Sequence, residues 1–404
     1  MMRVGIFVYF MPEGKSGGVQ QYAQQLIYAL GNYSDVEVKV FCSADNKKLF
    51  EVYESSKVSL VVLSRRCKYL RFFVTNKYIR QSSLLSAVWD WLLKTKFYPW
   101  LLHTAGDYKR CIEKSVDVIH FPYQALDRYD FNIPTVISLH DLQHKIFPEF
   151  FTKEDIKKRD IYGKKSAELA TRIMASFMHI KEDIVKFYGI TPEKIDICGL
   201  GYDNESAIDT AEFPAIQKKY GIFGEYLIYP SVTWKHKNHI NLVRALELLH
   251  KTYGRKITLV CTGSKNDFYP VIETEIKKLG LEKFVIWTGF IPETDLKILL
   301  KKSAAVIIPT LYEAESIPLI EAMALGAPVV CSSATVLPEQ IGGDARFIFD
   351  PHKPEDMAEK INAMVTDEKL RQENIQNSAK QMGSLQWQKK IVNFVDSYKK
   401  AAKG

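Results

Sequence analysis

Strand-forming and helix-forming segments alternate along nearly the whole chain, and this alternation constrains the fold more than any other feature. Parallel strands need crossover connections of a dozen or more residues, usually helices, so short β-branched runs separated by amphipathic stretches predict parallel sheets. The first half contains the predicted strands Arg3–Phe10, Val36–Phe41, Val58–Leu63, Asp117–Phe121, Thr135–Leu139, Arg172–Ala175 and Lys194–Cys198. The second half contains the predicted strands Tyr226–Pro230, Ile257–Cys261, Phe284–Trp287, Ala305–Ile308, Pro328–Cys331 and Arg346–Phe349. Two such sets predict an α/β protein with two doubly wound domains.

The boundary between these domains is predicted where strand patterns stop. Between residues 199 and 223, Gly, Asp, Asn and Pro gather, as is typical of loops. A chain of 404 residues also exceeds the usual size of one core. We therefore predict a first domain over residues 1–205 and a second over 206–385, with residues 386–404 as an amphipathic helix that packs back on the first. Ligands of open parallel sheets bind at the carboxyl ends of strands, so two facing sheets predict a cleft between the domains.

Cysteine usage and hydropathy bear on the compartment. The six cysteines form no C-x-x-C pair, and four of them lie in or beside predicted strands, which indicates reduced core residues and no disulfide framework. No stretch approaches the ~20 apolar residues that span a bilayer. The first ten residues are more typical of a strand than of a signal peptide, because they lack a small-residue cleavage site. We expect a cytoplasmic protein.

Basic residues concentrate between residues 64 and 110. This segment holds ten Lys and Arg against two Asp, an excess of eight that equals the formal net charge of +8. Trp and Tyr accompany the charges, and residues 82–91 have the spacing of an amphipathic helix. These features are typical of a helix in an anionic membrane interface, and equally of an ordinary helix packed on the first sheet. The first interpretation predicts peripheral contact with the inner face of the plasma membrane. No nucleic-acid recognition motif accompanies the charges, so we expect no nucleic-acid partner.

A short helix is predicted at the end of the strand Ala305–Ile308. Ser316 is a favoured N-cap residue, Pro318 fits the first turn, and the Gly-x-Pro run that follows ends the helix after about two turns. The free N–H groups and positive dipole end of such a helix bind anions such as a diphosphate. The predicted diphosphate contacts are Ser316, Ile317, Pro318 and Leu319.

Two glutamates flank this helix start, eight positions apart. Glu321 can accept two hydrogen bonds from vicinal ribose hydroxyls, and Glu313 can contact a donor sugar. A capping acid and a second acid favoured by the helix dipole would explain the same pair without any ligand.

The spacing and composition of this segment resemble the E-x7-E signature of the retaining glycosyltransferases of family 4. The matching residues are Glu313, Pro318, Glu321, Ala322, Met323, Gly326, Pro328 and Val329. The resemblance implies the GT-B fold, with two Rossmann-like domains facing across a cleft. It also implies sugar transfer from a nucleotide diphosphate donor, UDP- or GDP-linked, with retention. No Asp-x-Asp metal motif occurs in the sequence, so we expect no metal and no cofactor. The family usually has Gly-Phe-Gly or Gly-Phe-Ser after the first Glu, whereas this chain has Ala314-Glu315-Ser316.

The loop after strand Tyr226–Pro230 carries basic residues at the start of a predicted helix over Ile240–His250. Lysines there can stabilise the growing charge of a diphosphate leaving group. The Trp-x-His-Lys-Asn-His run resembles a branch of the same family, and Lys237-Asn238 matches the second half of that family's Gly-Arg and Lys-Asn pair. Ser231-Val232 replace the family's Gly-Arg, so Lys235 or His236 is predicted to supply the arginine's function. A solvated basic helix end is the alternative.

A glycine pair follows the first predicted strand. Gly17 and Gly18 would let backbone amides approach a phosphate closely, although most such pairs are simply turns. The run is neither a P-loop nor a G-x-G-x-x-G fingerprint. It resembles the family's first Gly-Gly loop, which makes Gln20 a candidate acceptor contact.

Two histidines end strands of the first domain. His140 matches the family's donor-contacting histidine, and we assign it to orienting the donor sugar. His120 is a further acceptor-side candidate. A structural histidine at the strand end is one alternative for His140, and zinc binding with His144 is another, although no third ligand is indicated nearby.

The sequence thus predicts a glycosyltransferase of cell-surface polysaccharide or glycoconjugate synthesis, acting on a glycan or lipid-linked acceptor. His140, Lys237 and Glu313 are its predicted catalytic residues. A non-catalytic sugar-nucleotide-binding protein, or a partner subunit of another glycosyltransferase, is the alternative. A phosphorylase is disfavoured because no lysine site for its cofactor is found, and an epimerase is disfavoured by the E-x7-E run.

Overall fold

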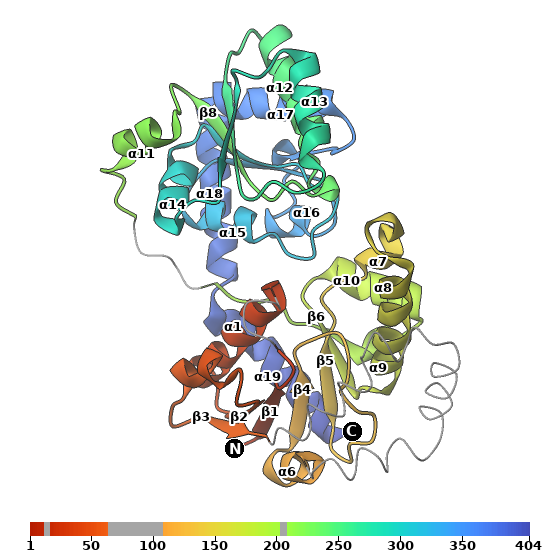
Figure 1. Cartoon of the computed structure of the whole chain (residues 1–404). Helices are drawn as coiled ribbons and strands as arrows, with labels where there is room; N and C mark the ends of the chain where they lie inside the picture. The colour runs from red at the N-terminus through yellow and green to blue at the C-terminus, as the bar shows by residue number, and fades with distance from the viewer. Residues whose placement is uncertain (12–16, 64–107, 203–207) are drawn as a thin grey trace. The chain divides into compact units, whose positions relative to one another are not determined.

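The computed structural model describes residues 1–11, 17–63, 108–202 and 208–404. These residues divide into two compact units, Met1–Gly201 with Trp387–Gly404, and Tyr202–Gln386. Figure 1 shows the course of the chain through both units. The amphipathic helix predicted over residues 82–91 lies outside the described residues, as does nearly all of the basic segment.

The described part of the first unit contains a seven-stranded parallel sheet in the order β3-β2-β1-β4-β5-β6-β7. Its strands are β1 (Arg3–Phe7), β2 (Glu37–Cys42), β3 (Val58–Val62), β4 (Val118–Phe121), β5 (Thr135–Ser138), β6 (Arg172–Ala175) and β7 (Ile195–Ile197). Every predicted strand is confirmed to within a few residues. The largest difference is at β1, which ends at Phe7 because the Met11 N–H donates to Val8 O and turns the chain there.

Helices surround this sheet. They are α1 (Gly17–Tyr33), α6 (Tyr108–Ser115), α7 (Gln143–Ile146), α8 (Lys153–Lys158), α9 (Lys164–Leu169), α10 (Met178–Asp183) and α19 (Trp387–Lys403). A π-helical segment, Arg159–Gly163, joins α8 to α9. The C-terminal helix α19 belongs to the first unit, although it follows the second in sequence.

Packing and ion pairs hold α19 on the first unit. It contacts α1 and the strands β4 to β7, and its buried residues include Trp387, Phe394 and Tyr398. A Cβ on Gly201 would lie 2.5 Å from Trp387 Cδ2, so only glycine fits there. The Asp196 carboxylate of β7 accepts hydrogen bonds from Ser397 Oγ at 2.7 Å and from Lys400 Nζ at 2.8 Å.

The second unit has a six-stranded parallel sheet in the order β10-β9-β8-β11-β12-β13. Its strands are β8 (Tyr226–Pro230), β9 (Thr258–Thr262), β10 (Val285–Gly289), β11 (Ala305–Ile308), β12 (Val329–Ser332) and β13 (Ile348–Phe349), all of which were predicted. Its helices are α11 (Phe213–Tyr220), α12 (His239–Lys251), α13 (Tyr269–Leu279), α14 (Glu293–Lys302), α15 (Ile317–Ala324), α16 (Leu337–Gln340), α17 (Pro354–Thr366) and α18 (Glu368–Ser384).

Both sheets reverse their strand order next to their first strand. In the first unit this point lies between β1 and β4, and in the second between β8 and β11. Open α/β sheets bind ligands outside the carboxyl ends of strands at such a point. The loops after β1, β4, β8 and β11 are therefore the places where each unit can bind a ligand.

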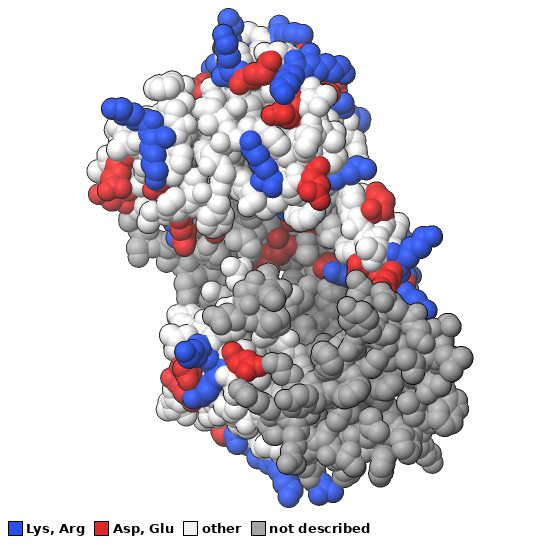
Figure 2. Space-filling model, in the orientation of Figure 1, with Lys and Arg blue, Asp and Glu red and all other residues white. Residues whose placement is uncertain are grey.

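Four cysteines, Cys42, Cys198, Cys261 and Cys331, are buried, as predicted for small core residues. No helix in the described ranges is both long and apolar enough to cross a bilayer. On the face drawn in Figure 2, Lys and Arg alternate with Asp and Glu over the second unit, so no single charge sign dominates that surface.

Candidate active site

The loop after β8 is held in place by one asparagine. It contains the short 3-10 turn Lys235–Lys237, and Asn238 follows with φ of 61°, a left-handed conformation that asparagine tolerates better than most residues. The buried Asn238 Nδ2 donates to Pro309 O at 2.9 Å and to Pro351 O at 2.8 Å. These bonds attach the β8–α12 loop to the segments that follow β11 and β13.

A partly buried ion pair joins this loop to the one after β11. Lys237 Nζ lies 2.6 Å from Glu313 Oε1, and the two side chains are 20% and 12% exposed. The Leu311 N–H also donates to His236 O at 2.8 Å. The structure therefore brings together two residues that were predicted separately for the site, although they are far apart in sequence.

Burial governs the electrostatics of this pair. It raises the pKa of the Glu313 carboxyl above its usual value, while the Lys237 charge and hydrogen bond oppose the rise. A lysine ammonium has three N–H donors, and Glu313 accepts one of them. Lys237 can thus maintain its hydrogen bond to the Glu313 carboxylate and donate a second hydrogen bond to an incoming anion.

The helix α15 begins at Ile317, in the same loop that carries Glu313. Ser316 occupies the predicted N-cap position, but its side chain makes no capping hydrogen bond. Instead the Ser316 N–H donates to Gln340 Oε1 at 3.2 Å. Ser316 Oγ and Gln340 Nε2 are both buried with no hydrogen-bond partner among the described residues. A hydroxyl and an amide nitrogen without hydrogen-bond partners therefore lie at the amino end of α15.

The other predicted residues of α15 occupy its first two turns. Ile317 is exposed, Pro318 is in the first turn, and Leu319 is fully buried in the core, so Leu319 offers a ligand only its backbone. Glu321 is partly buried on the same helix. The short helix ends before Gly326, which has φ of 67°, in agreement with the predicted length.

The two candidates for replacing the family's arginine differ in charge. Burial, together with the neighbouring Lys237, lowers the pKa of His236 to about 4, so its imidazole is neutral at pH 7. Lys235 is exposed at the start of the 3-10 turn. Of the two, only Lys235 can supply a second positive charge here.

His140 lies in the first unit, just after β5. Its Nε2–H donates to Pro122 O at 3.0 Å, and its ring makes an edge contact with Tyr22 at 4.5 Å between centroids. Burial lowers the pKa of His140 below its usual value, which favours the neutral ring. With Nε2 protonated, a neutral ring presents Nδ1 as a hydrogen-bond acceptor.

The structure gives His144 a partner other than a metal. Its Nε2 lies 2.9 Å from Asp160 Oδ1. In the described ranges, no group of three or more His, Cys, Asp or Glu has the arrangement of a metal site.

His120 is fully buried, and its two ring nitrogens lie 2.7 Å from Tyr398 Oη and 2.8 Å from Ser138 Oγ. We predicted that His120 contacts the acceptor. The structure instead places it in the core of the first unit, where both ring nitrogens already have hydrogen-bond partners. Gly17, Gly18 and Gln20 form the first turn of α1. A Cβ built on Gly18 meets no atom within 4 Å, so the space beside its backbone is open.

Comparison with known proteins identifies the family. The family Glycosyltransferase Family 4 matches residues 16–206, and the family Glycosyl transferases group 1 matches residues 212–381. Together these matches cover most of both units. The chain belongs to glycosyltransferase family 4.

Relatives and solved structures are similar to most or all of the length of this family 4 glycosyltransferase. The O-antigen chain mannosyltransferase B of Escherichia coli is 23% identical, over 95% of this chain and 96% of the relative. The O-antigen chain mannosyltransferase RfbU of Salmonella typhimurium is 24% identical, over 83% and 84% respectively. The crystal structure of Anabaena HepE in complex with UDP and glucose has a TM-score of 0.69 at 18% identity, over 99% and 100%. The fold of the chain is therefore GT-B, as predicted.

Two residues of this family 4 site were not predicted from the sequence. Thr335, at an unusual φ of 47°, exchanges two hydrogen bonds with Glu313: its Oγ1 donates to Glu313 O at 2.7 Å and accepts from the Glu313 N–H at 3.0 Å. Gln340 binds the Ser316 N–H. Both follow β12, the strand next to β11. Applying the strand-end rule to β12 would have indicated them.

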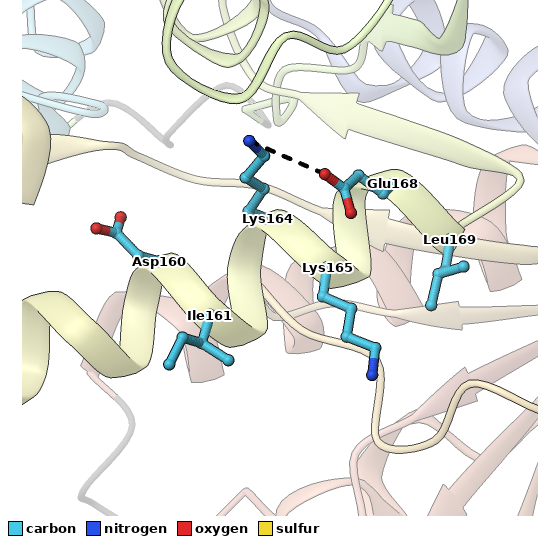
Figure 3. A pocket seen from close by; sticks show the side chains of 6 residues that line it. All are labelled: Asp160, Ile161, Lys164, Lys165, Glu168 and Leu169. Carbon is cyan, nitrogen blue, oxygen red and sulfur yellow. Dashed lines mark ion pairs between the residues drawn. The ribbon is translucent and has the colours of Figure 1, made fainter. Parts of the chain in front are cut away.

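A shallow surface depression in the first unit of this glycosyltransferase lies apart from these residues in sequence. It is lined by Asp160, Ile161, Lys164, Lys165, Glu168 and Leu169. Figure 3 shows these side chains along the π-helical segment and α9, with the Lys164–Glu168 ion pair marked. None of the predicted site residues lines this depression.

Proposed function

We propose that the protein is a retaining glycosyltransferase that moves a sugar from a nucleotide diphosphate sugar to a glycan or lipid-linked acceptor. The observation that carries the proposal is the Lys237–Glu313 pair, 2.6 Å apart and beside the amino end of α15. An ammonium, a helix dipole and two unsatisfied buried polar groups form a site for a diphosphate.

In the proposed reaction the bond between the sugar's anomeric carbon and the diphosphate breaks, and the diphosphate leaves with the electron pair. The acceptor hydroxyl forms the new bond on the same face and transfers its proton to the departing diphosphate. Lys237 and the amino end of α15 stabilise the charge that grows on the leaving group. Because a lysine supplies this charge, we expect unchanged turnover in EDTA, and loss of turnover would contradict metal independence.

The remaining residues bind or orient the substrates in this proposal. Glu321 accepts hydrogen bonds from the ribose hydroxyls, and Glu313 contacts the donor sugar while holding Lys237. His140 orients the donor sugar through its unprotonated Nδ1. Gln20 is the proposed acceptor contact, and Lys235 adds positive charge near the diphosphate.

The activities named for the relatives support a choice of transferred sugar and of biosynthetic process for this protein. Two relatives that match more than four fifths of the chain are O-antigen mannosyltransferases, which supports mannose as the transferred sugar and cell-surface polysaccharide synthesis as the process. HepE has been solved with UDP-glucose, which makes that donor the second to test.

The proposal is tested with a panel of donors. GDP-mannose, UDP-glucose, UDP-galactose and ADP-glucose are screened by thermal shift, because a ligand that binds only the folded state raises the melting temperature. Release of nucleoside diphosphate is then measured with a membrane extract as the source of lipid-linked acceptors. We expect one donor to stabilise the protein and to be consumed. A donor that binds but is never consumed would favour the non-catalytic alternative.

The basic segment supports a second part of the proposal, peripheral membrane contact. Residues 64–110 carry the whole net positive charge together with aromatic residues, a composition that favours anionic lipid. We expect the protein to float with vesicles that contain phosphatidylglycerol at low salt and not with neutral vesicles. Equal behaviour with both kinds of vesicle would contradict this contact.

A further inference from the structure

A continuous chain of buried, hydrogen-bonded polar groups runs through the first unit, and one of its members contacts the His140 ring. Tyr22 of α1, Ser138 of β5, His120 of β4 and Tyr398 of α19 are all at most 4% exposed. Tyr22 Oη lies 2.8 Å from Ser138 Oγ, Ser138 Oγ lies 2.8 Å from His120 Nε2, and His120 Nδ1 lies 2.7 Å from Tyr398 Oη. Four elements, one of them from the far end of the sequence, are thus joined by three hydrogen bonds.

A neutral imidazole can make all three hydrogen bonds of this chain, with one ring nitrogen donating and the other accepting. If Tyr398 donates to His120 Nδ1, then Nε2–H donates to Ser138 and Ser138 donates to Tyr22. In the reverse arrangement, Tyr22 donates to Ser138, Ser138 donates to His120 Nε2, and His120 Nδ1–H donates to Tyr398. Burial, with a further contribution from His140, lowers the pKa of His120 to about 3, so the neutral ring persists. Such a buried network fixes its members in place, because leaving any one group unpaired is unfavourable.

His140 is placed by the neighbours of this chain. Ser138 ends β5 two residues before His140, and His120 lies in β4 two residues before Pro122. Pro122 O accepts the His140 Nε2–H, and the Tyr22 ring contacts the His140 ring edge-on, with 75° between the planes. The position of the Tyr22 ring depends in turn on its hydroxyl bond to Ser138.

We propose that Tyr398 is a positioning residue for His140, acting through His120, Ser138 and Tyr22. The C-terminal helix α19 thereby sets the orientation of the imidazole that the proposed function assigns to the donor sugar. The kinetic consequence rests on that proposed function, whereas the coupling between the side chains does not.

The coupling is tested first by NMR of the histidine rings in the full-length protein. Ring nitrogen signals of His120 and His140 are assigned by comparison with His120→Gln and His140→Gln. In Tyr398→Phe, which removes one hydroxyl and keeps the ring, we expect both sets of signals to shift. The matched control is Tyr108→Phe, which removes another buried hydroxyl of this unit, bonded to Asp127 at 2.6 Å, and should leave both sets unchanged.

Unchanged His140 signals in a folded Tyr398→Phe protein would overturn the proposal. If that variant does not fold, Ser138→Ala interrupts the same chain at its centre and is judged by the same signals. A shift of His140 that Tyr108→Phe reproduces would also overturn it, because the effect would then be a general response to lost hydroxyls.

Steady-state kinetics then separate positioning from a merely structural role. We expect Tyr398→Phe to lower kcat about 10-fold with little change in KM for the donor, because a misplaced group loses rate more than binding. Tyr398→Phe and Ser138→Ala should not be additive, since they break one chain. Full additivity, or a loss confined to KM, would contradict the proposal. A wild-type protein without turnover on any donor would instead refute the proposed function, and the NMR result would still decide the coupling.

Discussion

Glu313 and Lys237 show what single residues contribute to the candidate site and what their sequence positions conceal. The sequence predicted each of them separately, from a helix start after a strand and from a family motif. Their 2.6 Å contact could not be predicted, because it depends on β8 and β11 being neighbours in the sheet. The environment of His120 could not be predicted either. It lies near the end of a strand, as a ligand-binding histidine would, but both of its ring nitrogens form hydrogen bonds to core residues.

Replacing Lys237 with alanine should slow catalysis more than it weakens donor binding. Removing the ammonium withdraws stabilisation from the leaving diphosphate, so we expect kcat to fall by the equivalent of about 2–4 kcal/mol. Steady-state kinetics measure this. Lys251→Ala is the control, because Lys251 pairs with Glu247 at the other end of α12. Equal rates in wild type and Lys237→Ala would remove the catalytic role.

Replacing Glu321 with alanine should have the opposite profile. The proposed contacts to ribose hydroxyls exist in both the ground state and the transition state, so their loss raises KM and leaves kcat nearly unchanged. We expect donor affinity to fall by about 1.5–3 kcal/mol, the value of hydrogen bonds to a charged group. Titration calorimetry with the donor measures it. An unaltered affinity would show that Glu321 is only a helix residue.

Among the elements, the strands were the most predictable and the connections the least. All thirteen predicted strands occur, because buried parallel strands read as continuous β-branched and aromatic runs. The π-helical segment Arg159–Gly163 and the four-residue α16 have no such pattern, since tertiary contacts decide them. The helix α15 was predictable from its cap and its terminating glycine, but its Gln340 contact comes from a different element.

The residue after β9, Gly263, packs closely against the β8–α12 loop, and a substitution there tests whether this packing shapes the site. Gly263 has φ of 97°, and a Cβ there would lie 2.8 Å from the backbone C and O of Ser231. We expect Gly263→Ala to lower the melting temperature and to weaken donor binding, because the loop carrying Lys237 must move. The backbone strain alone costs about 1–3 kcal/mol.

The control for this variant is Gly280→Ala. Gly280 also has a positive φ, 68°, but a Cβ there meets nothing within 4 Å. It should therefore lose stability without losing donor affinity. If both variants bind donor equally well, the close approach of Gly263 does not shape the site.

The docking of α19 should depend on pH through Asp196. Burial opposes ionisation of this carboxyl, but hydrogen bonds from Arg172, Lys400 and Ser397 outweigh it and lower its pKa. A lowered carboxyl pKa stabilises the fold above the unfolded value of about 3.9, and this contribution disappears as the pH falls through the folded pKa.

We therefore expect Asp196→Asn to weaken the hydrogen-exchange protection of α19 by about 1–3 kcal/mol at pH 7. The difference from wild type should begin to shrink as the pH falls below the unfolded value of ~4, and it should disappear as the pH passes through the lowered pKa of the folded carboxyl. Asp396→Asn on the exposed face of α19, paired loosely with Lys399 at 3.7 Å, serves as the control and should change little. A difference that persists unchanged at low pH would contradict the assignment.

At the scale of the whole molecule, the sequence predicted two α/β domains, and the family matches cover both halves. The structure divides the chain after Gly201 and returns Trp387–Gly404 to the first unit. The order of strands within each sheet could not be read from the sequence, because it depends on long-range pairing. That order nevertheless decides the site, since it places the loops after β8 and β11 side by side.

The central claim is that these two loops bind the diphosphate of the donor, and product affinity tests it most directly. Titration calorimetry compares the preferred nucleoside diphosphate with wild type, Lys237→Met and Lys251→Met. We predict that Lys237→Met weakens binding about 10- to 100-fold, the effect of losing one charge-assisted hydrogen bond, and that Lys251→Met binds like wild type. Equal affinity in all three proteins would contradict the account.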